Sequence, residues 1–184
     1  MFVVFDKNET VFAQGDEPSY YYQIVEGKVK MNNYNEDGKE FIQGLFSDGE
    51  SFGEPPLFCS VNYPANAVTL QPTRILLSSK NDFYRLLENE KSSCFDILQA
   101  LSSRLYYKSI MAPEISSNDS EKRILTLLSY IKEQNNANQK EYQVDLTRQQ
   151  IADRTGLRVE TVIRTIKEIE VKQQIRIQKG KLFF

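Results

Sequence analysis

Short apolar and β-branched runs alternate with polar, turn-forming residues over roughly the first 80 positions. The runs are Val3–Phe5, Thr10–Ala13, Tyr20–Val25, Lys28–Tyr34, Glu40–Phe46, Ala67–Leu70 and Thr73–Leu77. Asp37-Gly38 predicts a two-residue hairpin turn, because a type I′ turn needs positive φ at both central positions. Many short strands at regular spacing predict an antiparallel sandwich or barrel, and a β meander and a double-sheet jelly roll fit equally well.

The spacing of apolar residues becomes helical near Asn81. A short helix is predicted around Phe83, followed by a longer helix whose apolar positions recur at spacings of four, three and four. These positions are Cys94, Leu98, Leu101 and Leu105. Such a seam either packs against the chain's own β domain or pairs two copies of the helix in a homodimer. Pro113 should end or kink the helix, since proline lacks an amide donor and clashes with the preceding turn.

A Ser- and Asn-rich stretch at 116–120 predicts a hinge before a helical final third. Asn118 and Glu121 resemble a capping box, which predicts that a helix starts there. The apolar positions that follow at helical spacing are Ile124, Leu127, Leu128 and Ile131. Together they predict an amphipathic helix.

The segment that follows has helix-turn-helix spacing. Thr147 and Gln150 predict a capping box that opens a short helix. Gly156 lies four residues after Ala152, and Val162 lies six residues after Gly156. Glycine adopts the left-handed conformation of the turn at little steric cost, so two helices can cross closely there. An ordinary helical hairpin in a core is the alternative interpretation.

The second helix of this motif, about Val159–Glu170, carries charged residues on one face. In a recognition helix such residues read base edges in the major groove. Glu160 also suits a helix N-terminus, and an i,i+4 salt bridge to Glu160 is the structural alternative for Arg164. Two short apolar runs then flank Gln178–Lys181, which predicts a two-stranded wing with a basic tip.

Composition excludes several classes of function. The chain has 184 residues, no histidine and 2 cysteines. The lack of histidine removes Ser/His and Cys/His catalysis, His-ligated haem and the usual catalytic zinc sites. Two cysteines are too few for a disulfide framework or a Cys-ligated metal cluster. We therefore expect neither an enzyme nor a cofactor or metal site, although cupin-type metal enzymes also use β-rolls.

Charge is unevenly distributed along the chain. Residues 118–184 hold 13 Lys and Arg against 9 Asp and Glu, whereas residues 1–117 hold 10 against 16. The net positive charge therefore lies in the smaller, helical segment 118–184, which favours a nucleic-acid partner for that segment. No apolar run is long enough to span a bilayer and the first residues lack a basic region, so we expect a cytoplasmic protein without a membrane segment.

The order of these parts resembles the cAMP receptor protein/FNR (Crp/Fnr) family of bacterial transcription regulators. The segments that carry the resemblance are Tyr21–Lys30, Glu36–Glu40, Gly49–Glu54, Leu146–Ala152 and Gly156–Arg164. The resemblance implies an α+β fold with an amino-terminal cyclic-nucleotide-binding-type antiparallel β-roll (1–90), a long dimerisation helix and hinge (91–117) and a carboxy-terminal winged helix-turn-helix (118–184).

The function implied is a dimeric, sequence-specific DNA-binding transcription regulator. Its partners would be double-stranded DNA with a palindromic operator, a second copy of the chain, RNA polymerase and a small-molecule effector of unknown identity. The base-reading candidates are Val159, Glu160, Ile163 and Arg164. The candidates for phosphate contacts are Thr147, Arg148, Arg158, Thr161, Lys167 and Lys179. The dimer interface would be formed by Cys94, Leu98, Leu101 and Leu105.

The effector region departs from the cAMP-binding members. Gly53 and Glu54 match the pair that binds the ribose, but the phosphate-binding positions fall on Pro64 and Ala65, which offer neither charge nor hydroxyl. The family's contacts to the nucleotide base align with Lys108 and Ser109. Because a buried phosphate without a cation is costly, we expect the effector not to be cAMP and Gly53-Glu54 to be a structural turn. A sensor of cyclic nucleotides or other anions with the same fold is the alternative.

Overall fold

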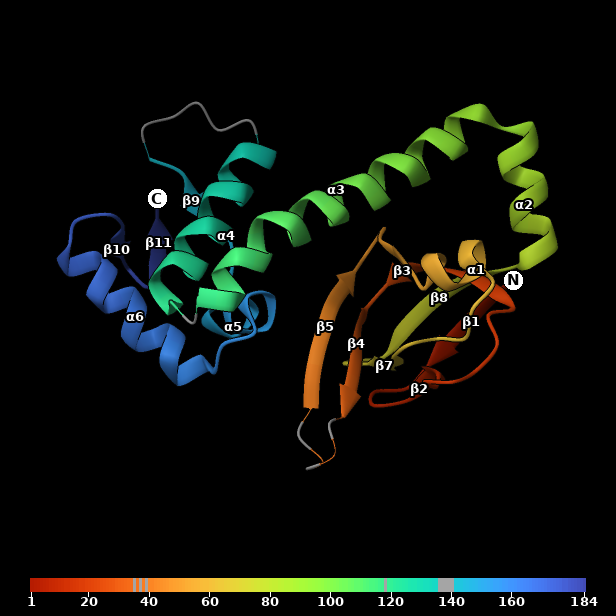
Figure 1. The fold of residues 1–184 in the computed structure, drawn as a ribbon, viewed down its shortest axis with the longest axis horizontal. Helices are drawn as coiled ribbons and strands as arrows, with labels where there is room; N and C mark the ends of the chain where they lie inside the picture. The colour runs from red at the N-terminus through yellow and green to blue at the C-terminus, as the bar shows by residue number, and fades with distance from the viewer. Residues whose placement is uncertain (35, 37, 39, 118, 136–140) are drawn as a thin grey trace. The chain divides into compact units, whose positions relative to one another are not determined.

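The computed structural model describes residues 1–34, 36, 38, 40–117, 119–135 and 141–184. The chain forms two compact units, Met1–Ile97 and Leu98–Phe184, which are described separately (Figure 1). Asp37, on which the predicted hairpin turn depends, lies outside the described residues, but the strands on either side of it pair as an antiparallel hairpin.

The first unit contains two four-stranded antiparallel sheets. One has the order β1 (Phe2–Phe5), β8 (Thr73–Ser79), β3 (Tyr20–Glu26) and β6 (Ser51–Phe52). The other has the order β2 (Thr10–Phe12), β7 (Asn66–Thr69), β4 (Lys28–Tyr34) and β5 (Glu40–Ser47). One core takes residues from both sheets, among them Ile24 and Ile75 from the first and Val29 and Ala67 from the second. The predicted β domain is therefore confirmed, in its two-sheet form.

The hydrophobic pattern predicted only strands and turns in the first 80 residues, but the structure also contains a helix there. Residues Glu54–Cys59 form a helix, α1, whose N-cap is Gly53 and which includes Pro55 and Pro56. Proline is tolerated in a first helical turn because the amide groups there have no partner within the helix. Leu57 is fully buried and clusters with Tyr21 and Phe83, so a tertiary contact stabilises a helix too short to show a periodic pattern.

Two helices follow the β-roll, α2 (Lys80–Asn89) and α3 (Lys91–Ser117). Pro113 was predicted to end or kink the second helix; it does not end it, because Pro113 lies inside α3, which continues to Ser117. The predicted hinge at 116–120 therefore begins within helix. The carbonyls of Glu114 and Ile115 in this last turn accept hydrogen bonds from Arg123, so a side chain of the next helix stabilises the turn that proline weakens.

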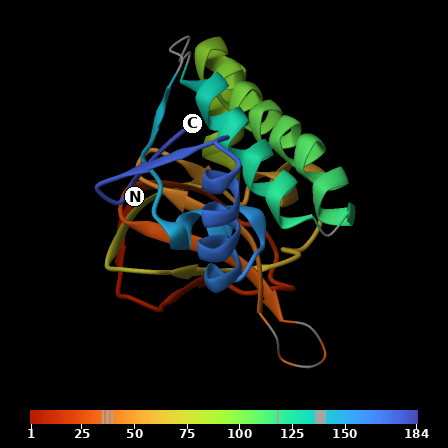
Figure 2. The same cartoon turned by 90° about the vertical axis from the view of Figure 1, so that its left-hand side faces the viewer.

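The second unit contains a winged helix-turn-helix. Helices α4 (Ser120–Gln134), α5 (Arg148–Thr155) and α6 (Val159–Val171) surround a core that includes Ile124, Leu128, Ile151 and Val162. The wing is a sheet with the order β10 (Arg176–Gln178), β11 (Lys181–Phe183) and β9 (Gln143–Val144). The two predicted wing strands are confirmed, whereas β9 is too short to have been predicted. Figure 2 shows α6 beside the wing.

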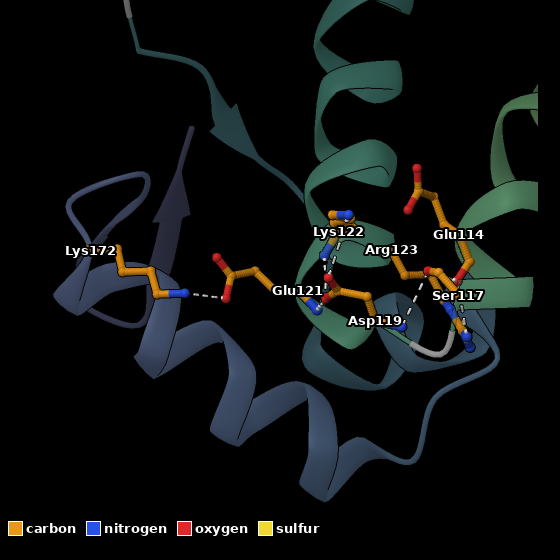
Figure 3. Close-up of polar contacts among 7 residues, drawn as sticks. All are labelled: Glu114, Ser117, Asp119, Glu121, Lys122, Arg123 and Lys172. Carbon is orange, nitrogen blue, oxygen red and sulfur yellow. Dashed lines mark hydrogen bonds and ion pairs between the residues drawn. The ribbon is translucent and has the colours of Figure 1, made fainter.

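Helix α4 begins one residue later than the predicted capping box places it. The N-cap is Asp119, whose Oδ1 accepts hydrogen bonds from the amides of Glu121 (3.0 Å) and Lys122 (3.1 Å) (Figure 3). Asn118 lies outside the described residues. A carboxylate at this position also interacts favourably with the positive end of the helix dipole.

Replacing Asp119 by alanine should destabilise α4 by about 1 kcal/mol, because two amides lose their acceptor. Native-state hydrogen exchange of the α4 amides measures this free energy. Asp119→Asn, which keeps a capping oxygen, should stay within about 0.5 kcal/mol of the wild type. Equal protection in the alanine variant and the wild type would contradict the capping role.

Among the described residues, no helix combines the length and apolar content needed to cross a bilayer.

Candidate nucleic-acid interface

The first helix of the helix-turn-helix begins at the predicted capping box. Thr147 Oγ1 accepts a hydrogen bond from the amide of Gln150 at 3.1 Å, and Gln150 Oε1 accepts one from the amide of Thr147 at 2.8 Å. This confirms the local prediction and fixes the start of α5.

The turn after α5 has the geometry that its glycine predicts. Gly156 has φ 67° and ψ 21°, in the left-handed region, and its amide donates to the carbonyl of Ala152. The amide of Leu157 donates to the same carbonyl at 3.1 Å. Val162 is fully buried and Leu157 packs against the same core, so α5 and α6 meet as a helix-turn-helix.

Helix α6 has one buried and one exposed face. Its buried positions are Val162, Thr165, Ile166 and Ile169. Its exposed positions include Glu160, Ile163, Arg164 and Lys167. Three of the four base-reading candidates are therefore accessible, whereas Val159 is half-buried and packs against the core. Arg158, at the N-cap, makes no capping hydrogen bond through its side chain, as its residue type predicts.

Arg164 pairs with Glu168, whereas the sequence analysis considered a salt bridge to Glu160. Its Nε lies 3.8 Å from Glu168 Oε1, one turn later, and not against Glu160. Both side chains are more than half exposed. Exposed pairs of this kind contribute about 0–1 kcal/mol, so this pair holds Arg164 only weakly.

The phosphate-contact candidates lie at the start of α5, on and before α6, and at the wing tip. Thr147, Arg158, Lys167 and Lys179 are exposed, whereas Arg148 and Thr161 are half-buried. Burial lowers the pKa of Arg148, and the nearby Glu170 carboxylate opposes that shift. Lys179 has φ 49° and Gly180 has φ 77°, so two successive left-handed residues form the wing tip.

The seam of α3 is only partly covered by the chain itself. Cys94 and Leu101 are half-buried, but Leu98 is 53% exposed and Leu105 is 70% exposed. Large apolar side chains exposed in a row on one helix are typical of a surface that contacts a partner.

The effector candidates of the first unit lie in a closely packed region. Gly53 has φ 77°, and a Cβ at this position would come within 3.2 Å of the Phe12 ring and 3.3 Å of the Tyr63 ring. These two rings stack with their centroids 3.7 Å apart. The side chains of Glu54 (1% exposed) and Ala65 (0%) are buried, whereas Pro64 is exposed. The positive φ and the closeness of the two rings therefore both favour glycine, which has no Cβ, at position 53.

The other two effector candidates, Lys108 and Ser109, are exposed residues of the second unit, and Ser109 Oγ donates to the carbonyl of Tyr106. Among the described residues, no group of three or more Cys, Asp or Glu side chains is arranged to hold a metal ion.

Sequence reasoning missed two residues that attach the helix-turn-helix to α3. Tyr107 donates to the carbonyl of Arg154, and Arg123 donates to the carbonyl of Thr155. A signal existed for Arg123, since it lies four residues before Leu127 and eight before Ile131, in the apolar stripe of α4. A charged residue in such a stripe is buried only with polar partners. Tyr107 carried no comparable signal.

Comparison with protein families matches two parts of the chain. Residues 2–90 match the cyclic nucleotide-binding domain, and residues 122–183 match the Crp-like helix-turn-helix domain.

Similar proteins cover almost the whole chain. The global nitrogen regulator of Nostoc sp. (strain PCC 7120) is 25% identical over 97% of this chain and 82% of its own length. The CRP-like cAMP-activated global transcriptional regulator of Mycobacterium tuberculosis is 23% identical over 96% of this chain and 80% of its own. A solved structure of CprK complexed with OCPA matches with a TM-score of 0.74 and 21% identity, over 100% of this chain and 86% of that one.

Proposed function

The chain belongs to the Crp/Fnr family of DNA-binding transcription regulators, and we propose that it acts as a homodimer that reads a palindromic operator with two copies of α6. The observation that carries this proposal is the exposed face of α6, where Glu160, Ile163 and Arg164 project from a helix whose opposite face is buried. RNA polymerase is proposed as a further partner, as a role in transcription regulation implies.

The side chains on this face have the chemistry of base recognition. An arginine donates two hydrogen bonds to O6 and N7 of guanine, and a glutamate accepts one from N4 of cytosine. Arg164 and Glu160 lie one helical turn apart, so together they suit a G·C pair in each half-site. Ile163 suits the methyl group of a neighbouring thymine. Val159 could reach such a methyl group only with the part of its side chain that the core leaves uncovered.

The surrounding groups suit the DNA backbone. Arg158, at the N-cap of α6, and Lys167, within α6, are exposed cations, and Lys179 lies at the wing tip. Such contacts add affinity and orientation without sequence information. Thr147, Arg148 and Thr161 complete the proposed phosphate contacts, with Arg148 constrained by its burial.

The dimer would form through α3. Leu98 and Leu105 leave an apolar strip exposed in the single chain, in line with Cys94 and Leu101. A two-fold pair would present two α6 helices to half-sites separated by one turn of DNA, about 10–10.5 bp.

Selection of bound sequences from a random duplex pool tests this proposal. It should be performed with and without an extract of cellular small molecules, because an effector controls DNA binding in some regulators. The expected result is an enriched palindrome with a G·C pair at matching positions of both half-sites. A pool that remains random under both conditions would contradict sequence-specific binding.

The effector is proposed to be a molecule other than a cyclic nucleotide. One similar protein is a cAMP-activated regulator and another was solved as a complex with OCPA, so the shared fold accompanies different ligands. The family resemblance aligns Pro64 and Ala65 with the phosphate positions, and the rings of Phe12 and Tyr63 lie against Gly53. The alternative, an anion sensor using Glu54 and Lys108, requires the buried Glu54 side chain to become accessible.

Titration calorimetry with cAMP, cGMP and c-di-GMP should give no binding heat. The reason is that burying a phosphate without a cationic partner leaves its desolvation uncompensated. A cAMP-activated member of the family provides the positive control. Saturable heat with a dissociation constant in the micromolar range would instead support the cyclic-nucleotide sensor.

A further inference from the structure

The last two carbonyl groups of α5 are bound by side chains from outside the helix-turn-helix. Tyr107 Oη, on α3, donates to the Arg154 carbonyl at 2.9 Å. Arg123 Nη1, on α4, donates to the Thr155 carbonyl at 3.2 Å. The final carbonyls of any helix lack partners within the helix, so they are available for such contacts. The end of α5 is thus tied to both preceding helices.

Arg123 also binds the end of α3. Its Nη2 donates to the carbonyls of Ile115 at 3.2 Å and Glu114 at 3.4 Å, and the residue is only 7% exposed. Figure 3 shows Arg123 on α4, close to Glu114 at the end of α3. The planar guanidinium group has donors directed to several sides, and its charge suits the partly negative carboxyl ends of two helices. One side chain therefore joins the end of α3 to the end of α5.

Tyr107 adds a second attachment one residue away on α5. Its ring packs against Tyr130, with centroids 4.9 Å apart. Burial raises the pKa of Tyr107 to about 12, so the hydroxyl stays protonated and donates at neutral pH. A single attachment would allow α5 to rotate about it, whereas two attachments at different points of α3 restrict that rotation.

The position of α6 depends on these contacts because α4, α5 and α6 share one core. The start of α4 is further linked to α6, since Ser120 Oγ lies 3.1 Å from Thr165 Oγ1 and Lys172 Nζ lies 2.6 Å from Glu121 Oε2. A movement of α5 relative to α3 would therefore carry the recognition helix with it.

We propose that Tyr107 and Arg123 are positioning residues that hold the helix-turn-helix in one orientation on the last turns of α3. This inference rests on the proposed function, because in a dimer built on α3 the orientation sets the spacing of the two α6 helices. Neither side chain needs to contact DNA. The junction is defined as Tyr107, Arg123 and the carbonyls they bind. It determines whether the two α6 helices fit both half-sites of the operator at once, and it does not change how one α6 helix recognises its own half-site.

Tyr107→Phe tests the junction, since it removes the hydroxyl and keeps the ring. Tyr130→Phe is the matched control, because the Tyr130 ring packs against Tyr107 at a tilt but its hydroxyl makes no hydrogen bond to a described residue. Hydrogen exchange of the amides at the end of α5 and the end of α3 is measured without DNA. We expect exchange about 3- to 10-fold faster in Tyr107→Phe, the size of effect expected for one lost hydrogen bond, and unchanged exchange in Tyr130→Phe.

The DNA measurement compares a palindromic duplex with a duplex that carries one half-site. Tyr107→Phe should weaken binding to the palindrome about 3- to 10-fold and change binding to the single half-site less than about 2-fold. Arg123→Lys keeps the charge but cannot reach both helix ends, so it should show the same pattern with a larger loss. Tyr130→Phe should match the wild type on both duplexes.

Two results would overturn the inference. One is unchanged exchange in Tyr107→Phe at both helix ends. The other is an equal loss on the palindrome and the single half-site, which would mean that the reading surface itself is damaged. Failure of the proposed function looks different, since the wild-type protein would then bind neither duplex specifically. In that case the exchange measurement still decides whether the junction holds α5 on α3.

Discussion

Replacing Arg164 by alanine should weaken binding to the selected operator by about 1–3 kcal/mol per half-site, or roughly 5- to 150-fold. The reason is that a bidentate contact to guanine is lost while the fold is kept, since Arg164 is exposed and its ion pair with Glu168 is weak. Fluorescence anisotropy with operator duplexes measures the change. Duplexes that carry each of the other base pairs at the G·C position should then bind the variant almost equally.

Lys167→Ala is the matched control for this measurement. Lys167 is exposed on the same helix, and its proposed contact is to phosphate. Its loss should weaken binding to all duplexes by a similar factor and reduce the slope of log K against log salt by about one. If Arg164→Ala also lowers operator and random-duplex affinity equally, Arg164 contacts the backbone and the base-reading assignment is wrong.

Replacing Leu105 by glutamate should raise the dimer dissociation constant by roughly 100-fold or more. In a parallel pair of α3 helices, Leu105 of one chain faces the same residue of the other, so the variant would place two carboxylates together in an apolar interface. An uncompensated buried charge costs about 3–5 kcal/mol. Sedimentation equilibrium measures the dissociation constant, and binding to the palindrome should fall towards that of a single half-site.

Tyr106→Glu provides the control for Leu105→Glu. Tyr106 is 52% exposed and lies next to Leu105 in the chain, but the helix turns it about 100° away from the seam. The control should remain dimeric at the concentrations at which Leu105→Glu dissociates. Should Tyr106→Glu dissociate and Leu105→Glu remain paired, the dimer would use a different face of α3.

The sequence predicted most accurately those features that depend on near neighbours. The capping box of Thr147 and Gln150, the left-handed Gly156 and the buried Val162 are all found, because each depends on residues within a few positions of one another. The strands of the β-roll were predicted for the same reason, since alternation along a strand reflects which side faces the core. The exposed face of α6 follows likewise from helical spacing.

The failures concern contacts that periodicity and capping do not decide. Of the two outcomes predicted for Pro113, an end of α3 is wrong, since the helix continues to Ser117, and Arg123 binds carbonyls of its last turn. Helix α1 has too few residues to show a period and depends on the burial of Leu57. Arg164 could pair with a carboxylate one turn before or after it, and the sequence contains both Glu160 and Glu168.

The amino-acid sequence by itself predicted short antiparallel strands, then a long helix, then a winged helix-turn-helix, and it predicted which face of α6 is polar; the choice of a β-roll came from the family resemblance. Those features follow from periodicity and capping, which act over a few residues. Only the tertiary structure decided how α5 is attached to α3, because the attachment consists of side chains bound to backbone carbonyls. Every residue has such a carbonyl, so residue identity does not reveal which of them a distant tyrosine or arginine will bind.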